Sequence, residues 1–330
     1  MLPIAVDAMG GDKAPDEIVA GARQAAEEFD VPVILVGRPD EIGDAGELEV
    51  VPASEVIAMD ADAGSAVRAM KDSSLVRGAE LVRDGRASAM VSAGNTGATM
   101  ASALLRMGRI KGVARPAIAT PLPVPGAATP TVMLDAGANA ECQPQWLVQF
   151  AQMGAVYARD RYDIDRPRVG LLSIGEEPSK GTSLVKETHV ALATTPALEA
   201  AGADFIGNVE GRDLLTGAAD VVVADGFTGN VALKTLEGGL RVLIGSILNV
   251  FGTNDETKQA ADTLLPYLLP LYETLTPDNI GGAMLLGVNG VCIISHGSSS
   301  ARAIVNAVGV AADLVRQDVV SELRSAVTGA

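Results

Sequence analysis

Short runs of β-branched residues alternate with helical patterns along almost the whole chain. The runs that we expect to be strands are residues 2–6, 33–36, 48–51, 87–91, 117–120, 131–134, 169–173, 204–208, 221–224 and 291–295. The helical patterns between them include residues 15–29, 73–84, 96–107, 145–157 and 183–194. Such alternation is typical of βαβ units and a mainly parallel sheet, which binds its ligands outside the carboxyl ends of the strands.

Glycine-rich loops with polar side chains follow six of these runs. They span residues 7–12, 92–97, 135–139, 173–181, 224–230 and 296–299. Glycine lets backbone N–H groups approach an anion closely, and the N-terminus of a following helix adds partial positive charge. One such loop would have an ordinary steric explanation, but six of them indicate loops that converge on one crevice. The sequence therefore predicts an α/β enzyme that handles phosphate.

Composition excludes several other classes of protein. The formal net charge of −16 argues against general nucleic-acid binding, which requires a basic face. The two cysteines, Cys142 and Cys292, make neither a disulfide framework nor a metal quartet. We find no signal-peptide pattern and no run of the ~18 apolar residues typical of a spanning helix. We therefore expect a soluble, cytoplasmic protein.

Residues 238–275 break the alternation, because two helical stretches follow one another with no strand between them. The natural turn is at residues 252–255. Residues 264–272 are apolar on nearly every side and contain Pro266 and Pro270, which predicts a kinked helix or a helical end. We expect one catalytic domain over residues 1–330 with a projecting hairpin, and the hairpin to contact a second subunit or a membrane.

Eight short motifs of the chain resemble, in order and spacing, those of the bacterial phosphate acyltransferases of phospholipid synthesis. They are residues 7–12, 92–98, 174–177, 180–181, 209–213, 225–230, 281–282 and 296–298. This resemblance covers essentially the whole chain. It implies a three-layer α/β/α sandwich similar to phosphotransacetylases and to isocitrate and isopropylmalate dehydrogenases. It also implies a homodimer that associates loosely with membranes through a helical hairpin.

The activity that the resemblance implies needs no cofactor and no metal. A fatty acyl-[acyl carrier protein] and inorganic phosphate are converted to acyl phosphate and free carrier protein, and a glycerol-3-phosphate acyltransferase acts downstream. This chain departs from the family at two places. Met284 stands where relatives commonly carry proline, and Arg241 and Lys258 are the only cations of residues 238–275, where relatives are often rich in lysine.

Phosphate attack on a thioester requires donors that hold the nucleophile and donors for the oxyanion that develops on the carbonyl. Lys180 offers a compact cation in a glycine-bounded loop, the alternative being a solvated surface lysine. Asn230, at the start of a long helix, can present its amide to the same oxygens or serve as a plain N-cap. His296 is either a proton donor to the leaving thiolate or a structural hydrogen-bonding residue.

Further phosphate- or substrate-binding positions are expected from the same loops: Gly10, Gly11, Asn95, Thr96, Gly97, Gly181, Gly226, Thr228, Gly229 and Ser298. The aspartates of these loops (Asp7, Asp12, Asp135 and Asp225) are expected to orient backbone and lysine side chains rather than to touch the anion. A divalent-metal site is the disfavoured alternative. Cys292 lies within a strand and Cys142 has no adjacent histidine, so direct displacement by phosphate is favoured over covalent catalysis.

Four cations (Arg106, Arg109, Lys111 and Arg115) fall within ten residues that contain no Asp or Glu. Because an acyl carrier protein is acidic, we expect this patch to dock it, the alternative being a solvated helix end. The acyl chain needs an apolar groove, and the leucine-rich hairpin is the expected wall. The alternative functions are an acyl-CoA phosphotransacylase and a non-catalytic membrane-surface scaffold. A decarboxylating dehydrogenase is disfavoured, because its nucleotide and metal-carboxylate motifs are not evident.

Overall fold

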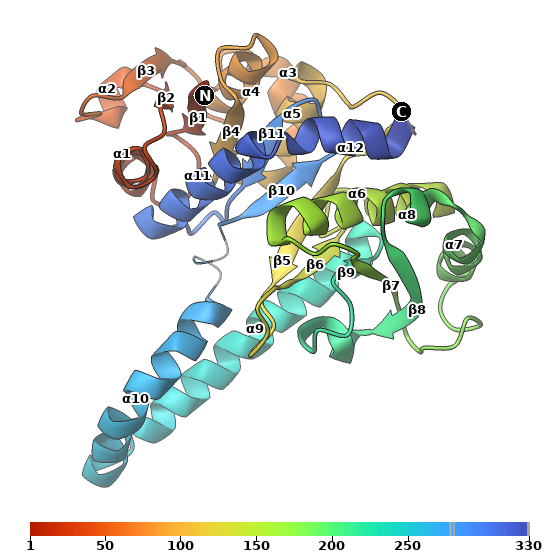
Figure 1. The fold of residues 1–330 in the computed structure, drawn as a ribbon. Helices are drawn as coiled ribbons and strands as arrows, with labels where there is room; N and C mark the ends of the chain where they lie inside the picture. The colour runs from red at the N-terminus through yellow and green to blue at the C-terminus, as the bar shows by residue number, and fades with distance from the viewer. Residues whose placement is uncertain (277–278, 280, 329–330) are drawn as a thin grey trace.

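The strands of the chain form one continuous sheet (Figure 1). The structure is a computed structural model that describes residues 1–276, 279 and 281–328. Within these residues the strands are β1 (Ile4–Asp7), β2 (Val33–Gly37), β3 (Glu49–Pro52), β4 (Ala89–Ser92), β5 (Ala117–Leu122), β6 (Thr131–Leu134), β7 (Arg168–Ser173), β8 (Asp204–Glu210), β9 (Val221–Val223), β10 (Ala283–Leu286) and β11 (Val291–Ile294). Their order in the sheet is β3-β2-β1-β4-β11-β10-β5-β6-β9-β7-β8. Each strand that the sequence predicts is confirmed to within two residues at either end.

Both halves of the sheet are parallel, and the antiparallel pairs lie where the halves meet. β10 pairs antiparallel with β11 and β5, with Met284 opposite Ala119, and β5 pairs antiparallel with β6. The sequence analysis missed β10, because four apolar residues that follow a glycine pair carry no alternation that distinguishes a strand from a turn. The mainly parallel sheet is confirmed.

Helices cover both faces of the sheet, as a three-layer fold requires. The α-helices of the described residues are α1 (Asp16–Phe29), α2 (Pro39–Ile42), α3 (Ala63–Ala69), α4 (Ser74–Arg83), α5 (Thr96–Arg106), α6 (Pro144–Tyr162), α7 (Ser183–Thr194), α8 (Ala197–Ala200), α9 (Gly226–Phe251), α10 (Asp255–Leu275), α11 (Ala301–Arg316) and α12 (Val319–Thr328), with a 3-10 helix η1 at Gly211–Leu215.

The side chains of β1 alternate between the two faces of the sheet and contribute to the hydrophobic core on each face. Ile4 and Val6 pack in the cluster that contains Ile304 of α11, whereas Ala5 packs in the cluster that contains Val76 of α4. Successive side chains of a strand point to opposite faces, so a fully buried four-residue strand fills two cores. The α/β/α sandwich expected from the sequence is therefore present.

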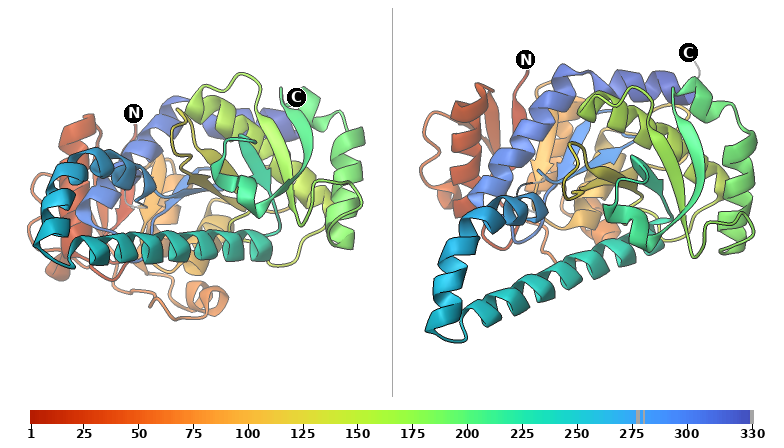
Figure 2. Two further views of the ribbon diagram at one scale, coloured as in Figure 1. Left: turned by 90° about the horizontal axis from the view of Figure 1, so that it is seen from below. Right: turned by 60° about the horizontal axis from the view of Figure 1, so that its bottom comes forward.

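Helices α9 and α10 project from this body as a hairpin (Figure 1). The turn falls at residues 252–254 as predicted, and Asn254 caps α10 by accepting the Thr257 N–H at 3.0 Å. Pro266 and Pro270 lie inside α10 and not at its end. Figure 2 shows the two helices diverging from the turn, so much of their apolar surface stays uncovered, as at Tyr267, which is 80% exposed.

None of the helices in the described ranges is long and apolar enough to cross a membrane.

Candidate active site

A cavity of about 660 Å³ lies between the carboxyl ends of the central strands and the part of α9 from Asn230 to Ile244. Its polar end is lined by Asp12, Thr96, Asn230, His296 and Ser298. Its wall is lined mainly by apolar residues, with three charged residues of α9 (Lys234, Glu237 and Arg241) among them: Ile118, Leu122, Leu233, Leu236, Leu240, Ile244, Tyr272 and Leu275. Ligand pockets are typically of this size and combine mostly apolar walls with a few polar groups. The cavity brings together Thr96, Asn230, His296 and Ser298 from the predicted site.

Asp7 ties the loop after β1 to the loop after β4. The Ser92 hydroxyl donates to Oδ2 of Asp7 at 2.7 Å, and the Gly94 N–H donates to the Ser92 hydroxyl oxygen at 2.9 Å. A Cβ at Gly10 would lie 2.4 Å from Oδ2 of Asp7, so only glycine fits there. Burial raises the pKa of the Asp7 carboxyl, against the opposing effect of its hydrogen bonds. Asp7 therefore orients the backbone, as the sequence analysis expected.

The loop after β1 also joins the loop after β11. The Asp12 N–H donates to the Gly297 carbonyl at 2.7 Å. Gly11 has a φ of +113°, which an L-residue rarely adopts, and a Cβ there would lie 3.1 Å from the same carbonyl. Gly10 and Gly11 thus allow three loops to meet, and this packing explains both glycines without a contact to substrate.

Asp135 has the same role in the second half of the sheet. Its carboxylate accepts the N–H groups of Ile118 at 3.0 Å, Gly137 at 3.1 Å, Ala138 at 2.9 Å and Asn139 at 2.8 Å. Burial is the largest influence and raises the pKa of Asp135, while these donors oppose the shift. A carboxylate with so many backbone partners shapes its loop and has little capacity left for a ligand.

Helix α9 begins at Asp225, whose carboxylate accepts the Thr228 N–H at 2.9 Å and the Thr228 hydroxyl at 2.7 Å. Gly226 and Gly229 allow this first turn to press against the loop of Asp135, since a Cβ at Gly229 would lie 2.0 Å from the Asp135 carbonyl oxygen. Thr228, Gly226 and Gly229 therefore have structural explanations in the start of the helix.

Asn230 is not the N-cap of α9, because it lies in the second turn of the helix. Its amide donates to the Ala136 carbonyl at 3.1 Å, and a Cβ at Gly137 would lie 3.0 Å from its amide nitrogen. The side chain thus fastens the loop after β6 to α9 while lining the cavity. The plain N-cap interpretation is wrong, and Asp225 fills that position.

His296 opens the turn between β11 and α11 and is exposed at the polar end of the cavity. Its Nδ1 lies 2.9 Å from the Ser298 hydroxyl oxygen and accepts the Ser298 N–H at 3.3 Å. Because Nδ1 is an acceptor, the neutral ring carries its proton on Nε2. The ring therefore has a donor available that none of the described hydrogen bonds uses.

Asn95 is engaged by a neighbouring loop. Its amide nitrogen donates to the carbonyls of Ala58 at 3.3 Å, Met59 at 2.8 Å and Ala61 at 3.2 Å. Its Oδ1 caps α5 by accepting the Ala98 N–H at 2.9 Å. These bonds leave Thr96, the next residue, as the member of this loop that lines the cavity. Gly97 contacts α3, where its Cβ would lie 3.0 Å from the side chain of Ala63.

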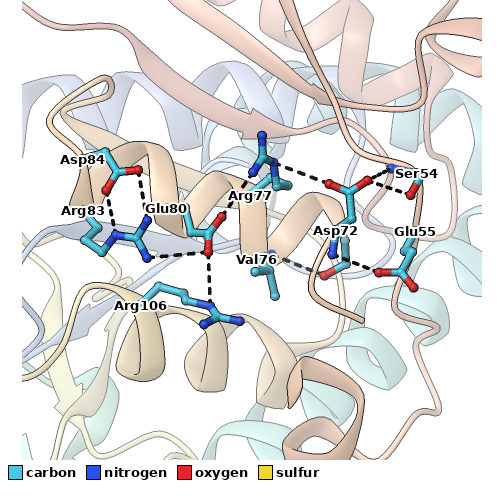
Figure 3. Close-up of polar contacts among 10 residues, drawn as sticks. Ser54, Glu55, Asp72, Val76, Arg77, Glu80, Arg83, Asp84 and Arg106 are labelled. Carbon is cyan, nitrogen blue, oxygen red and sulfur yellow. Dashed lines mark hydrogen bonds and ion pairs between the residues drawn. The ribbon is translucent and has the colours of Figure 1, made fainter. Parts of the chain in front are cut away.

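Asn95 holds the segment between β3 and α4, residues 53–73. This segment covers part of the polar end of the cavity, which Met59 lines. Figure 3 shows how the two ends of this loop are joined. The Ser54 hydroxyl donates to Asp72 at 2.7 Å, and the Asp72 N–H donates to Glu55 at 2.9 Å. The segment of residues 53–73 is thus fixed at its two ends by the hydrogen bonds of Asp72, and near Met59 by Asn95.

Lys180 lines neither this cavity nor the small hollow beside it. It is exposed at the end of the loop after β7, and the described ion pairs include none at its ammonium group. The hollow, of about 160 Å³, lies between Gly181 and Thr182 on one side and Asp225 and Thr228 on the other. The first turn of α9 separates it from the large cavity, so the six predicted loops surround two neighbouring spaces and not one.

One of the four cations of the predicted docking patch, Arg106, is engaged in an ion pair within the protein. Arg106 is half-buried and forms an ion pair with Glu80 at 3.6 Å, within a network that continues to Arg77 and Arg83 (Figure 3). The other three cations are exposed. Arg109 donates to the Ala114 carbonyl, and the guanidinium of Arg115 stacks 4.6 Å from the centre of the Trp146 ring, so Arg109, Lys111 and Arg115 present a preorganised basic surface.

Neither thiol has the surroundings of a nucleophile. Burial raises the pKa of Cys142 to about 11 and that of Cys292 to about 12. Among the residues that the structure describes, no three His, Cys, Asp or Glu side chains are grouped so that they could hold a metal ion. The expectation of a metal-free reaction stays a prediction.

One buried polar side chain is not predicted from the sequence. Asn208 of β8 is 6% exposed and contacts the half-buried His189 of α7. The available signal was an amide side chain at a buried strand position between Ile206 and Val209, where an apolar residue is usual.

Comparison with solved structures defines the fold class. A phosphotransacetylase from Streptococcus pyogenes superposes with a TM-score of 0.66 at 18% identity, covering 96% of this chain and 94% of that one. The EutD phosphotransacetylase from Staphylococcus aureus gives a TM-score of 0.63 at 17% identity, covering 95% of this chain and 94% of that one. The architecture is therefore the phosphotransacetylase-like α/β/α fold.

Sequence relatives define the family within that class. The family model described as "Fatty acid synthesis protein" matches residues 2–322. The phosphate acyltransferase of Heliobacterium modesticaldum is 48% identical over 99% of this chain and 98% of its own length. That of Desulforudis audaxviator is 47% identical over 97% of this chain and 94% of its own length. The chain belongs to the phosphate acyltransferase family, and it is an acyltransferase.

Proposed function

We propose that the protein transfers a fatty acyl group from acyl carrier protein to inorganic phosphate, giving acyl phosphate and free carrier protein. The observation that carries this proposal is the cavity of about 660 Å³, because it joins polar residues of several loops to a long, mainly apolar wall. An acyl thioester has the same two parts, a polar carbonyl and an apolar chain. A phosphotransacetylase-like fold combined with an apolar groove suits an acyl chain longer than acetyl.

The acyl chain lies along α9 in this proposal. Leu233, Leu236, Leu240 and Ile244 recur at helical spacing and form one stripe of the wall. The thioester carbonyl then sits at the polar end, where the Nε2 proton of His296 and the hydroxyl of Thr96 can donate to the developing oxyanion. Helices α5 and α11 start at the ends of the adjacent strands β4 and β11, and their N-termini favour negative charge there.

Phosphate binds among the loops of Lys180 and Asn230, at the end of the large cavity that Asn230 lines, where it can reach the thioester carbonyl. A hollow beside this place lies at the N-termini of α7 and α9, and it is lined by Thr182, the N-cap of α7, and by Thr228 of the first turn of α9. Both N-termini favour negative charge nearby. The flexible stem of Lys180 brings an ammonium group to the anion. A phosphate oxygen attacks the thioester carbon, the C–S bond breaks, and the electron pair leaves with the thiolate of the carrier protein.

The proposed reaction also needs partners for substrate delivery and product release. Arg109, Lys111 and Arg115 dock the acidic carrier protein. The exposed apolar hairpin binds a second copy of the chain at its base and a membrane at its tip, since such a surface is too extensive to stay bare. Acyl phosphate is released to a downstream acyltransferase that esterifies glycerol 3-phosphate.

The direct test is to incubate the purified protein with long-chain acyl carrier protein and phosphate, and to trap acyl phosphate with hydroxylamine. We expect hydroxamate above the background from the thioester itself only when phosphate is present, and less of it from the corresponding acyl-CoA. Preference for the CoA thioester would favour a phosphotransacylase instead. No hydroxamate from either thioester, with the cellular role intact in a Lys180→Ala protein, would favour a scaffold.

The position of the acyl chain is tested by filling the groove. Leu240→Trp adds volume to the cavity wall, so turnover of long acyl chains should fall about tenfold, or 1.4 kcal/mol, while short chains are spared. Leu243→Trp is the matched control, because Leu243 lies on the same helix, is 57% exposed, and does not line the cavity. An equal effect of both changes on all chain lengths would place the chain elsewhere.

A further inference from the structure

Asn208 fastens the loop that carries Lys180. Its amide nitrogen donates to the carbonyl of Gly175 at 3.3 Å and to the carbonyl of Glu177 at 2.9 Å. The side chain is buried within β8; its bond to Gly175 is buried and its bond to Glu177 is partly buried. A buried amide that reaches two carbonyls of one loop limits the conformations which that loop can adopt.

Both carbonyls belong to residues that touch Lys180. The Glu177 carbonyl also accepts the N–H of Lys180 at 2.9 Å. Gly175 lies directly under the stem of the lysine, because a Cβ at Gly175 would lie 2.8 Å from Lys180 Cγ. The backbone of Lys180 therefore bonds to Glu177, and its side-chain stem packs on Gly175. Asn208 holds the carbonyls of these same two residues.

His189 sets the orientation of this amide. With the amide nitrogen facing two carbonyls, Oδ1 of Asn208 faces Nδ1 of His189 at 2.9 Å. A carbonyl oxygen can only accept, so Nδ1 carries a proton. The imidazole ring packs edge-on against Phe205, 5.2 Å between ring centres, which fixes the ring from the other side. The chain of contacts runs from α7 through β8 to the loop after β7.

We infer that Asn208, oriented by His189, is a positioning residue that places the ammonium group of Lys180 for the transfer to phosphate. This inference rests on the proposed function, in which Lys180 binds the anion. Neither Asn208 nor His189 lines the two cavities, so their effect on the reaction passes through the loop. Small displacements of a positioned group are costly, about 10²-fold for 1 Å.

A double-mutant cycle tests the inference. Lys180→Ala should lower kcat by 10²–10³, roughly the cost of one lost donor. Asn208→Ala should lower kcat about 10²-fold in the parent enzyme and should have little further effect in the Lys180→Ala enzyme, because the group that it positions is gone. KM for the acyl carrier protein should change little in both backgrounds.

Gln152→Ala is the matched control. Gln152 is also a buried amide whose nitrogen donates to two carbonyls, those of Ala197 and Ala326, both at 3.4 Å. Its deletion should lower the melting temperature as Asn208→Ala does, without the loss of kcat. If Asn208→Ala fails to fold, His189→Leu provides the second test, with a smaller fall in kcat that again disappears in the Lys180→Ala background.

The outcomes separate this inference from the proposed function. A parent enzyme that makes no acyl phosphate contradicts the proposed function itself. An active parent in which Asn208→Ala or His189→Leu lowers kcat equally with and without Lys180 contradicts the positioning role. An active parent in which Asn208→Ala folds and keeps full kcat contradicts it as well.

Discussion

The backbone N–H of Ser298 points at Nδ1 of His296 from 3.3 Å, and the hydroxyl oxygen of Ser298 lies 2.9 Å from the same nitrogen. These two contacts decide which ring nitrogen of His296 is left to hydrogen-bond a ligand. Nδ1 is occupied by the turn that His296 opens, and the proton of the neutral ring is on Nε2. One nitrogen of His296 is thus structural, and the role of the ring as a proton donor stays a prediction.

We predict that His296→Ala lowers kcat by about 10²-fold, as expected for the loss of one oxyanion donor. His296→Gln should recover part of the loss, because its amide can donate from a similar position. Steady-state assays with saturating phosphate measure both effects. Full activity in His296→Ala would leave the histidine with its structural role alone.

Cysteine chemistry is predicted to be dispensable. A raised pKa favours the neutral thiol, so thiolate forms only as the pH rises toward about 11 for Cys142 and about 12 for Cys292. At neutral pH, Cys142 has roughly two to three orders of magnitude less thiolate than an ordinary cysteine. Cys142→Ala should therefore keep turnover within about twofold, and alkylation of the parent should be slow and accelerate with pH. Loss of acyl transfer at unchanged stability would indicate a covalent intermediate.

Charge reversal is predicted to weaken encounter with the carrier protein. Arg109→Glu with Lys111→Glu should raise KM about tenfold at low salt, since exposed charges steer association. The defect should shrink as salt rises, because the screening length falls from ~10 Å at 0.1 M to ~3 Å at 1 M. The control is Lys71→Glu with Arg86→Glu, which changes the net charge equally at exposed positions outside the patch. Equal effects of the two pairs would remove the docking role.

The hairpin is predicted to touch membranes near its tip. Val250 next to the turn and Leu264 in the middle of α10 are 60% and 48% exposed, so Val250→Glu with Leu264→Glu should release the protein from vesicles and leave acyl transfer to soluble substrate intact. Binding should depend weakly on anionic lipid, because the hairpin has few cations. Val190→Glu is the control at an exposed apolar residue outside the hairpin. Loss of the dimer with unchanged vesicle binding would replace the membrane contact by a subunit interface.

Local sequence patterns predicted most of the sheet and the hairpin turn, because strand periodicity and turn residues act over a few positions. They did not predict that β10 runs antiparallel between β11 and β5, which depends on pairing between distant segments. The loops were found from their glycines, yet Gly10 and Gly229 are explained by close approach to Asp7 and Asp135 rather than by an anion.

Side-chain partners were the least predictable part of the site. Asn95 and Arg106 both stand in suggestive motifs, but their donors are used by the Met59 loop and by Glu80. Asn208 lies in a strand, and only the structure shows that it reaches the loop of Lys180. Such partners come from different elements, so no spacing rule along the chain reveals them.

The most direct test of the central claim is a phosphorus-31 NMR time course of the purified protein with long-chain acyl carrier protein and inorganic phosphate. The account predicts that an acyl phosphate resonance grows at the same rate as the free thiol of the carrier protein appears. Release of thiol without a new phosphorus resonance would show hydrolysis instead of transfer to phosphate, and would contradict the function proposed for this cavity.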